Sequence, residues 1–175
     1  MLYRPFASLI LMLTVVVMTL PSQSSGSSAA PIECGYKSNC AGTNGDDIII
    51  GGNKIKNLVI VGHDGNDVIN ASAGDDDACG GNGNDQINGE DGNDRLVGDS
   101  FLCKAEVGPG SAPGMDIIRG GAGNDILIHG NANGNYDDSD GKRDLLDCGP
   151  GDDTAILNIT IDHDEAVNCE HINTQ

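Results

Sequence analysis

A nine-residue repeat is the feature that most restricts the fold of this chain. From Gly62 to Val97 the sequence reads GHDGNDVIN, ASAGDDDAC, GGNGNDQIN and GEDGNDRLV without a gap. In each copy, glycine stands two positions before a repeated aspartate and an apolar residue stands two positions after it. Self-similarity at a fixed short period is typical of stacked repeat folds, so successive copies should form successive turns of one solenoid.

Further copies of the pattern lie on both sides of this block. They begin at Gly42, Ser111, Gly120 and Cys148, and a degenerate copy around Asp144 lacks the glycine. The repeated aspartates are Asp47, Asp67, Asp76, Asp85, Asp94, Asp116, Asp125 and Asp153. The glycines that accompany them in the regular copies are Gly65, Gly74, Gly83, Gly92 and Gly123.

Elementary geometry explains the period. The apolar residue can centre a strand of about three residues, and glycine with Asn or Asp allows the positive φ values that a tight turn needs. Two copies then make one coil, so Asp67 and Asp85 fall on one edge of the solenoid, and Asp76 and Asp94 fall on the other. Stacked turns lie ~4.8 Å apart. That gap suits Ca²⁺, which takes about 6 to 8 oxygen ligands from carboxylates and backbone carbonyls.

These residues resemble the haemolysin-type, or RTX, calcium-binding nonapeptide repeat, whose pattern is G-G-x-G-x-D-x-U-x with U apolar. The resemblance covers Gly42 to Ile156. It implies an all-β fold, a parallel β-roll or β-helix solenoid with short capping segments. It also implies several bound Ca²⁺ ions, with the repeated aspartates and glycines named above as the metal site.

Three stretches depart from the regular spacing. Asp47 and Asp67 are 20 residues apart, one coil plus two residues, and the half-turn GGNKIKNLV between them places Lys56 at the aspartate position. A cation there would repel Ca²⁺, so we expect no ion at that turn. Irregular, turn-rich inserts lie near residues 98–113 and 129–143. Because their lengths are not multiples of nine, the edges of Asp116, Asp125, Asp144 and Asp153 stay open.

The two ends of the sequence differ from the repeat region. Residues 1–29 have the pattern of a secretory signal peptide, with Arg4 before a run from Leu9 to Leu20 that only two threonines interrupt. We expect an N-terminal cap at 30–41, the roll at 42–156 and a C-terminal cap at 157–175. After removal of the signal, no segment is apolar enough to span a membrane.

Six cysteines follow the expected signal: Cys34, Cys40, Cys79, Cys103, Cys148 and Cys169. An even count in a secreted chain without CxxC spacing favours disulfides over zinc. Fifteen pairings are formally possible. We expect the three local ones, Cys34 with Cys40, Cys79 with Cys103 and Cys148 with Cys169, because repeat folds bring near-sequence segments together.

Charge and motifs restrict the function. The formal net charge of -18 disfavours nucleic acid and favours cations as partners. No HExxH, GxSxG or Walker A motif occurs, so we expect a non-enzymatic secreted module, structural, at the cell surface or adhesive, with cell-surface or matrix carbohydrate as a candidate contact. The alternative is a polysaccharide-active enzyme that uses two carboxylates. His163, between two aspartates, is either a transition-metal ligand or, as we expect, a solvent-exposed side chain.

Overall fold

The computed structural model describes residues 30–35, 38–52, 57–100, 103, 113–130, 141–157, 159 and 162–174. The signal peptide expected at 1–29 lies outside these residues, as does most of each insert. The described residues form strands and no α-helix, as an all-β fold requires. Among them there is accordingly no helix long and apolar enough to cross a membrane.

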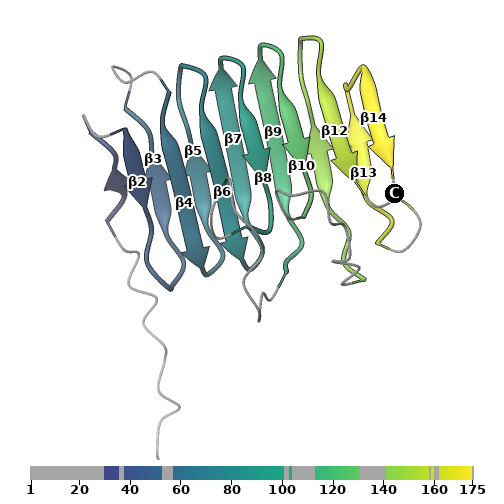
Figure 1. Cartoon of the computed structure of the whole chain (residues 1–175). Helices are drawn as coiled ribbons and strands as arrows, with labels where there is room; N and C mark the ends of the chain where they lie inside the picture. The colour runs from purple at the N-terminus through teal and green to yellow at the C-terminus, as the bar shows by residue number, and fades with distance from the viewer. Residues whose placement is uncertain are drawn as a thin grey trace, which may run out of the picture.

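Fourteen strands form two parallel sheets of seven strands each (Figure 1). The first sheet holds β1 (Ile32–Glu33), β3 (Ile48–Ile50), β5 (Val68–Asn70), β7 (Gln86–Asp91), β9 (Ile117–Ala122), β11 (Leu145–Asp147) and β13 (Glu165–Val167). The second holds β2 (Asn39–Ala41), β4 (Val59–Asp64), β6 (Asp77–Asn82), β8 (Arg95–Val97), β10 (Ile126–Ile128), β12 (Thr154–Leu157) and β14 (His171–Thr174).

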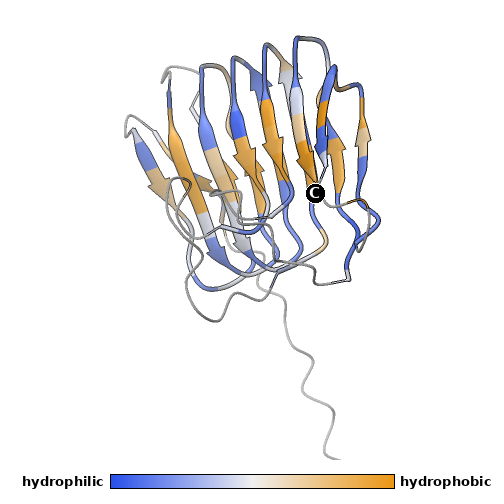
Figure 2. Cartoon of the chain, turned by 45° about the vertical axis from the view of Figure 1, so that its right-hand side comes forward, coloured by the Kyte–Doolittle hydropathy of each residue, from blue (hydrophilic) through white to orange (hydrophobic). Residues whose placement is uncertain are grey.

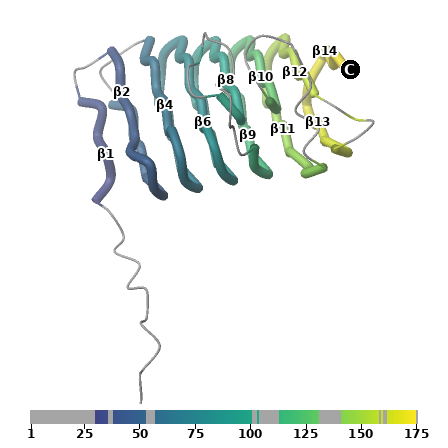
Figure 3. Tube along the Cα trace, turned by 60° about the horizontal axis from the view of Figure 1, so that its bottom comes forward, coloured from purple at the N-terminus to yellow at the C-terminus, as the bar shows by residue number. Residues whose placement is uncertain are grey.

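The chain alternates between the sheets, so each odd strand and the even strand after it make one coil of a parallel β-roll. The coils follow one another in chain order from one end of the molecule to the other, as the view in Figure 3 shows. β1 and β2 form the first coil, and β13 and β14 form the last. The segments expected as caps therefore continue the two sheets.

The apolar residue of each repeat points into the roll. In the first sheet these residues are Ile49, Ile69, Ile87, Ile118 and Leu146, and in the second they are Ile60, Ala78, Leu96, Leu127 and Ala155; all are at most 1 % exposed. In-register pairing stacks them, as where Ile69 pairs with Ile87. Figure 2 shows the result as hydrophobic bands within the strands and hydrophilic turns at the edges. The core is one residue wide in most strands, so the fold depends strongly on what its turns contribute.

A second, smaller core lies on the outer face of the second sheet. Cys79, Val97 and Ile128 alternate with the interior residues of β6, β8 and β10, yet all three are buried. Cys103, in the first insert, packs against them, and the Arg95 guanidinium donates a hydrogen bond to its carbonyl. Cys103 thus lies on this outer face of the second sheet.

Three disulfides join the six cysteines in the pairs expected from the sequence: Cys34–Cys40, Cys79–Cys103 and Cys148–Cys169. The first lies within the first coil and the second fixes the first insert to β6. The third ties the turn after β11 to the turn before β14. Covalent links therefore hold both ends and the largest irregularity of the roll.

The turn between β3 and β4 corrects one expectation. Val59 pairs with Asp77, so the position that aligns with Asp76 is Leu58, and not Lys56. This turn has eight residues, 51–58, where the regular turn 71–76 has six. The two extra residues therefore precede the aspartate position and shift it toward the next strand. Lys56 itself lies outside the described residues.

Candidate metal centre

Every repeated aspartate directly precedes a strand, and this placement makes two ladders along the roll. The first ladder contains Asp47, Asp67, Asp85, Asp116 and Asp144, which precede strands of the first sheet. The second contains Asp76, Asp94, Asp125 and Asp153, which precede strands of the second sheet. The structure thus assigns an edge to the four aspartates that the irregular spacing left open. Both inserts lie in turns on the edge of the first ladder.

Apart from Asp47, the first in its ladder, each ladder aspartate uses one carboxylate oxygen to link adjacent coils. Oδ1 of Asp85 accepts a hydrogen bond from the backbone N–H of Asp67 at 2.8 Å, and Oδ1 of Asp94 accepts one from Asp76 at 2.8 Å. The same contact recurs across the first insert, from the Asp85 N–H to Asp116 Oδ1 at 2.8 Å. These bonds keep the turns in register where the chain between them is much longer than one coil.

Two acidic residues that the repeat pattern does not mark extend the ladders. Asp164 Oδ1 accepts from the Asp144 N–H at 3.0 Å, and Glu170 Oε2 accepts from the Asp153 N–H at 3.0 Å. Asp164 directly precedes β13, and Glu170 directly precedes β14. An acidic residue just before an apolar-centred strand was the available signal for both.

The second carboxylate oxygen has a different environment. Oδ2 is buried and has no hydrogen-bond partner in Asp67, Asp76, Asp85, Asp94, Asp116, Asp125 and Asp153. Burial raises the pKa of Asp67 to about 6 and the pKa values of Asp85 and Asp94 to about 7. Burial also raises the pKa of Asp116 well above its usual range, and nearby Asp99 adds to the shift. A buried carboxylate oxygen without a donor requires a proton or a cation.

Glycine keeps the space beside these oxygens open. A Cβ on Gly62, Gly80, Gly89, Gly98 or Gly120 would lie closer than 3.0 Å to the Oδ2 atoms of Asp67, Asp85, Asp94, Asp116 and Asp125, respectively. At all of these except Gly80, the same Cβ would also meet a backbone carbonyl oxygen of the following coil. In these four turns a carboxylate oxygen and a carbonyl oxygen thus converge on one point. The sequence reasoning missed these glycines, although four of them stand five positions before their aspartate.

The glycines named from the sequence have another task. Gly65, Gly74, Gly83, Gly92 and Gly123 all have positive φ, between 119° and 147°. A Cβ on Gly92 would collide with the carbonyl of Gly74 one coil earlier. These glycines let the turns stack closely. Their membership of the metal site stays a prediction.

We call Gly62, Gly80, Gly89, Gly98 and Gly120 the cradle glycines, because each leaves open the space beside an aspartate Oδ2. The five turns that have both a cradle glycine and an Oδ2 without a hydrogen-bond partner fit Ca²⁺. The donors are hard oxygens, carboxylate and carbonyl, and several meet at each turn, as this ion requires. The ladder aspartates Asp67, Asp85, Asp94, Asp116 and Asp125 would hold it, with the adjoining turn carbonyls. Asp76 and Asp153 also carry an unpartnered oxygen, but Ala71 and Cys148 replace the cradle glycine there.

Two turns near the N-terminal end are filled differently. Oδ2 of Asp47 accepts hydrogen bonds from the N–H and Oγ1 of Thr43, at 2.6 and 2.9 Å. A Cβ on Gly51 would lie 2.9 Å from Cδ1 of Leu58. Leu58 therefore places hydrocarbon where other turns place a carboxylate. The expectation that this turn holds no ion stays a prediction, with Leu58 as its basis.

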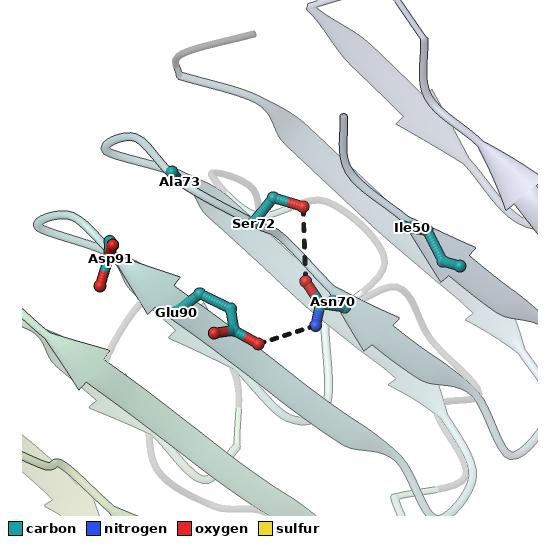
Figure 4. Close-up of a pocket in the computed structure, with 6 residues that line it drawn as sticks. All are labelled: Ile50, Asn70, Ser72, Ala73, Glu90 and Asp91. Atoms are coloured by element: carbon teal, nitrogen blue, oxygen red, sulfur yellow. Dashed lines mark hydrogen bonds between the residues drawn. The ribbon is translucent and has the colours of Figure 1, made fainter. Parts of the chain in front are cut away.

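A shallow pocket on the first sheet bears on the enzyme alternative (Figure 4). It has a volume of about 440 Å³, and its acidic residues are Glu90 and Asp91. Glu90 Oε1 accepts hydrogen bonds from the amides of Asn70 at 2.9 Å and Asn88 at 2.7 Å. A two-carboxylate hydrolase needs one carboxyl that donates a proton. Oε1 of Glu90 serves here as an acceptor within the sheet, and the enzyme alternative stays a hypothesis.

Comparison with known proteins agrees with the geometry. The family model described as RTX calcium-binding nonapeptide repeat (4 copies) matches residues 59–87, 80–101 and 113–135. The matched residues include all five cradle glycines and span both ladders. No curated protein and no solved structure matches the chain. The match confirms the resemblance drawn from the repeat itself.

Proposed function

Because the chain carries RTX calcium-binding nonapeptide repeats, we propose that it is a secreted structural module whose roll folds when its turns bind Ca²⁺. The observation that best supports this proposal is the set of buried Oδ2 atoms without a hydrogen-bond partner. Five of them, in the glycine-cradled turns of Asp67, Asp85, Asp94, Asp116 and Asp125, are the proposed ion sites.

The charge of the ladders is the physical reason for calcium-dependent folding. Successive aspartates of one ladder are one strand spacing apart. Burial is the main cause of the raised pKa of Asp85, and repulsion by its ladder neighbour Asp67 adds to it. With a net charge of -18 and a narrow core, the chain gains little from compaction while these carboxylates are ionised and bare. Bound Ca²⁺ supplies positive charge and joins oxygens of adjacent coils.

The location and biological role extend the same proposal. The signal-like residues 1–29 and the three disulfides both favour an oxidising extracellular compartment. Extracellular modules bind calcium with dissociation constants of ~10⁻⁴ to 10⁻³ M, so their sites fill outside the cell. A stiff roll of this kind suits a structural, surface or adhesive role, with surface or matrix carbohydrate as the proposed contact.

Calorimetric titration with Ca²⁺, together with circular dichroism, tests the proposal. Calcium-free protein at neutral pH should lack most of its β signal, and about five ions per chain should restore it, one for each cradled turn. Mg²⁺ should fail to do so, because its smaller octahedral shell prefers water to widely spaced carbonyls. A calcium-free protein that keeps its full β spectrum and melting temperature would show that the disulfides and the core alone hold the roll.

A further inference from the structure

The last step of the first ladder differs from the steps before it. His129 directly follows β10, and the strand register aligns it with Gly62, Gly80 and Gly98 of the preceding coils. Its imidazole Nδ1 lies 3.4 Å from Asp164 Oδ2 and 3.6 Å from Asp144 Oδ2. A ring therefore occupies the side of the turn that glycine keeps open elsewhere.

A third carboxylate meets this ring from the last coil. Three residues each offer one ligand atom here, and these atoms all lie within 4.8 Å of one another: His129, Asp162 and Asp164. These residues are 3 %, 4 % and 7 % exposed. Asp162 Oδ1 accepts a hydrogen bond from the Gly141 N–H at 2.8 Å, but its Oδ2 is buried without a partner. Apart from the seven ladder oxygens, it is the only buried side-chain oxygen of the described residues that lacks a hydrogen-bond partner.

We propose that His129, Asp162 and Asp164 form a site for a divalent transition metal of the Zn²⁺ class. Imidazole and carboxylate together are ligands that such metals favour, and three protein ligands leave one position for water. With metal–ligand bonds of about 2.0 to 2.1 Å, tetrahedral ligands lie roughly 3.3 to 3.4 Å apart. The separation of 3.4 Å between His129 Nδ1 and Asp164 Oδ2 matches that value.

The charges at this site also favour a divalent cation. The two ligand carboxylates and a neutral imidazole compensate its charge, which matters in a buried position, and Asp144 is a further acidic group beside the ring. Ca²⁺ fits poorly, because it takes only oxygen ligands in large number and the imidazole fills the cradle. His163, the histidine between the two aspartates in sequence, is exposed and is not part of the cluster.

Calorimetric titration with Zn²⁺ tests the site in full-chain protein kept in excess Ca²⁺, so that the ladders are filled. One Zn²⁺ per chain should bind that Ca²⁺ does not displace. His129→Asn should weaken this binding by about a hundredfold or more, the upper range seen even for outer-shell changes. His163→Asn is the matched control, with the same replacement at an exposed, positive-φ position, and should bind Zn²⁺ as the parent does.

Asp162→Asn provides a second variant, because asparagine keeps the acceptor for the Gly141 N–H and removes only the carboxylate charge. It should also lose the Zn²⁺, with its calcium-dependent β spectrum unchanged. In the parent, Co²⁺ should give the visible absorption of a four- or five-coordinate ion with a nitrogen ligand. Absence of calcium-resistant Zn²⁺ binding, or equal binding by the parent and both site variants, would overturn the site. Neither result depends on whether calcium drives folding.

Discussion

At the scale of the residue, the aspartate of each cradled turn divides its two oxygens between two tasks. Oδ1 accepts the backbone N–H of the coil before it, a contact that an asparagine could make equally well. Oδ2 is the oxygen that needs the carboxylate charge to be compensated. Substituting asparagine for aspartate therefore separates the role in stacking from the role in ion binding.

Asp85→Asn should have effects of opposite sign with and without calcium. In calcium-free buffer at pH 7.5 it should stabilise the folded roll by on the order of 2 kcal/mol, because burial raises the pKa of Asp85 to about 7 and the variant carries no charge there. With calcium near a hundredfold above its dissociation constant, loss of one ion should lower stability by about 2.7 kcal/mol. Denaturant unfolding in both buffers measures the two values.

Asp75→Asn is the matched control for Asp85→Asn. Asp75 is exposed, and its Oδ1 accepts from the Asn93 N–H at 3.0 Å, so the substitution removes the same charge without touching a buried oxygen. Its calcium stoichiometry should equal that of the parent. Equal stoichiometry for Asp85→Asn as well would exclude the assigned ligand oxygen.

At the scale of the element, the sequence predicts regular turns well and altered turns poorly. Asp67 and Asp85 could be assigned to one edge because 18 residues make one coil wherever nothing is inserted. Lys56 was assigned wrongly because the period reveals that two residues are extra but not where in the turn they lie. His129 could not be foreseen as a ligand, since its partners come from a later coil that only the stacking brings near.

The turn between β3 and β4 offers a test of what a cradle requires. Leu58→Asp replaces the hydrocarbon beside Gly51 with a carboxylate aligned with Asp76, and it should add one calcium ion per chain. Without calcium it should destabilise the roll by about 2–5 kcal/mol, as loss of a buried leucine does. Leu58→Asn should have the same cost and add no ion. Calorimetric stoichiometry that is unchanged in Leu58→Asp would mean that the longer turn cannot close around an ion.

The Cys148–Cys169 disulfide should control the stability of the last coil. It closes a separation of 21 residues, for which chain entropy predicts about 3 kcal/mol. Replacing both cysteines with serine should therefore lower the unfolding free energy by about that amount. Hydrogen exchange should accelerate chiefly in β13 and β14, because β14 pairs only with β12. Uniform acceleration along the whole roll would instead indicate that all seven coils unfold as one unit.

At the scale of the whole molecule, the roll is a one-dimensional stack in which each strand pairs only with the strands of neighbouring coils. Its interior core is mainly one column of side chains per sheet, and its edges carry columns of buried carboxylates. The balance between these columns decides whether the stack forms. Whatever neutralises the carboxylates should therefore favour the fold, and protons and calcium ions should act as alternatives.

This competition predicts pH profiles of opposite slope. The ladder carboxylates have folded-state pKa values raised to about 6 for Asp67 and about 7 for Asp85 and Asp94, against about 3.8 when unfolded. A carboxyl group whose pKa is raised by folding stabilises the folded state fully at pH values below its unfolded-state pKa. This stabilisation is lost as the pH rises through its folded-state pKa. Calcium-free protein should thus be most stable near pH 4 and lose stability between about pH 4 and 7. Calcium-saturated protein should instead gain stability over the same range, because protons no longer compete for Oδ2.

Thermal melts followed by circular dichroism measure both profiles, with calcium removed beforehand on a resin, since soluble chelators weaken in acid. Parallel profiles in the two buffers would show that the buried carboxylates are not where calcium binds.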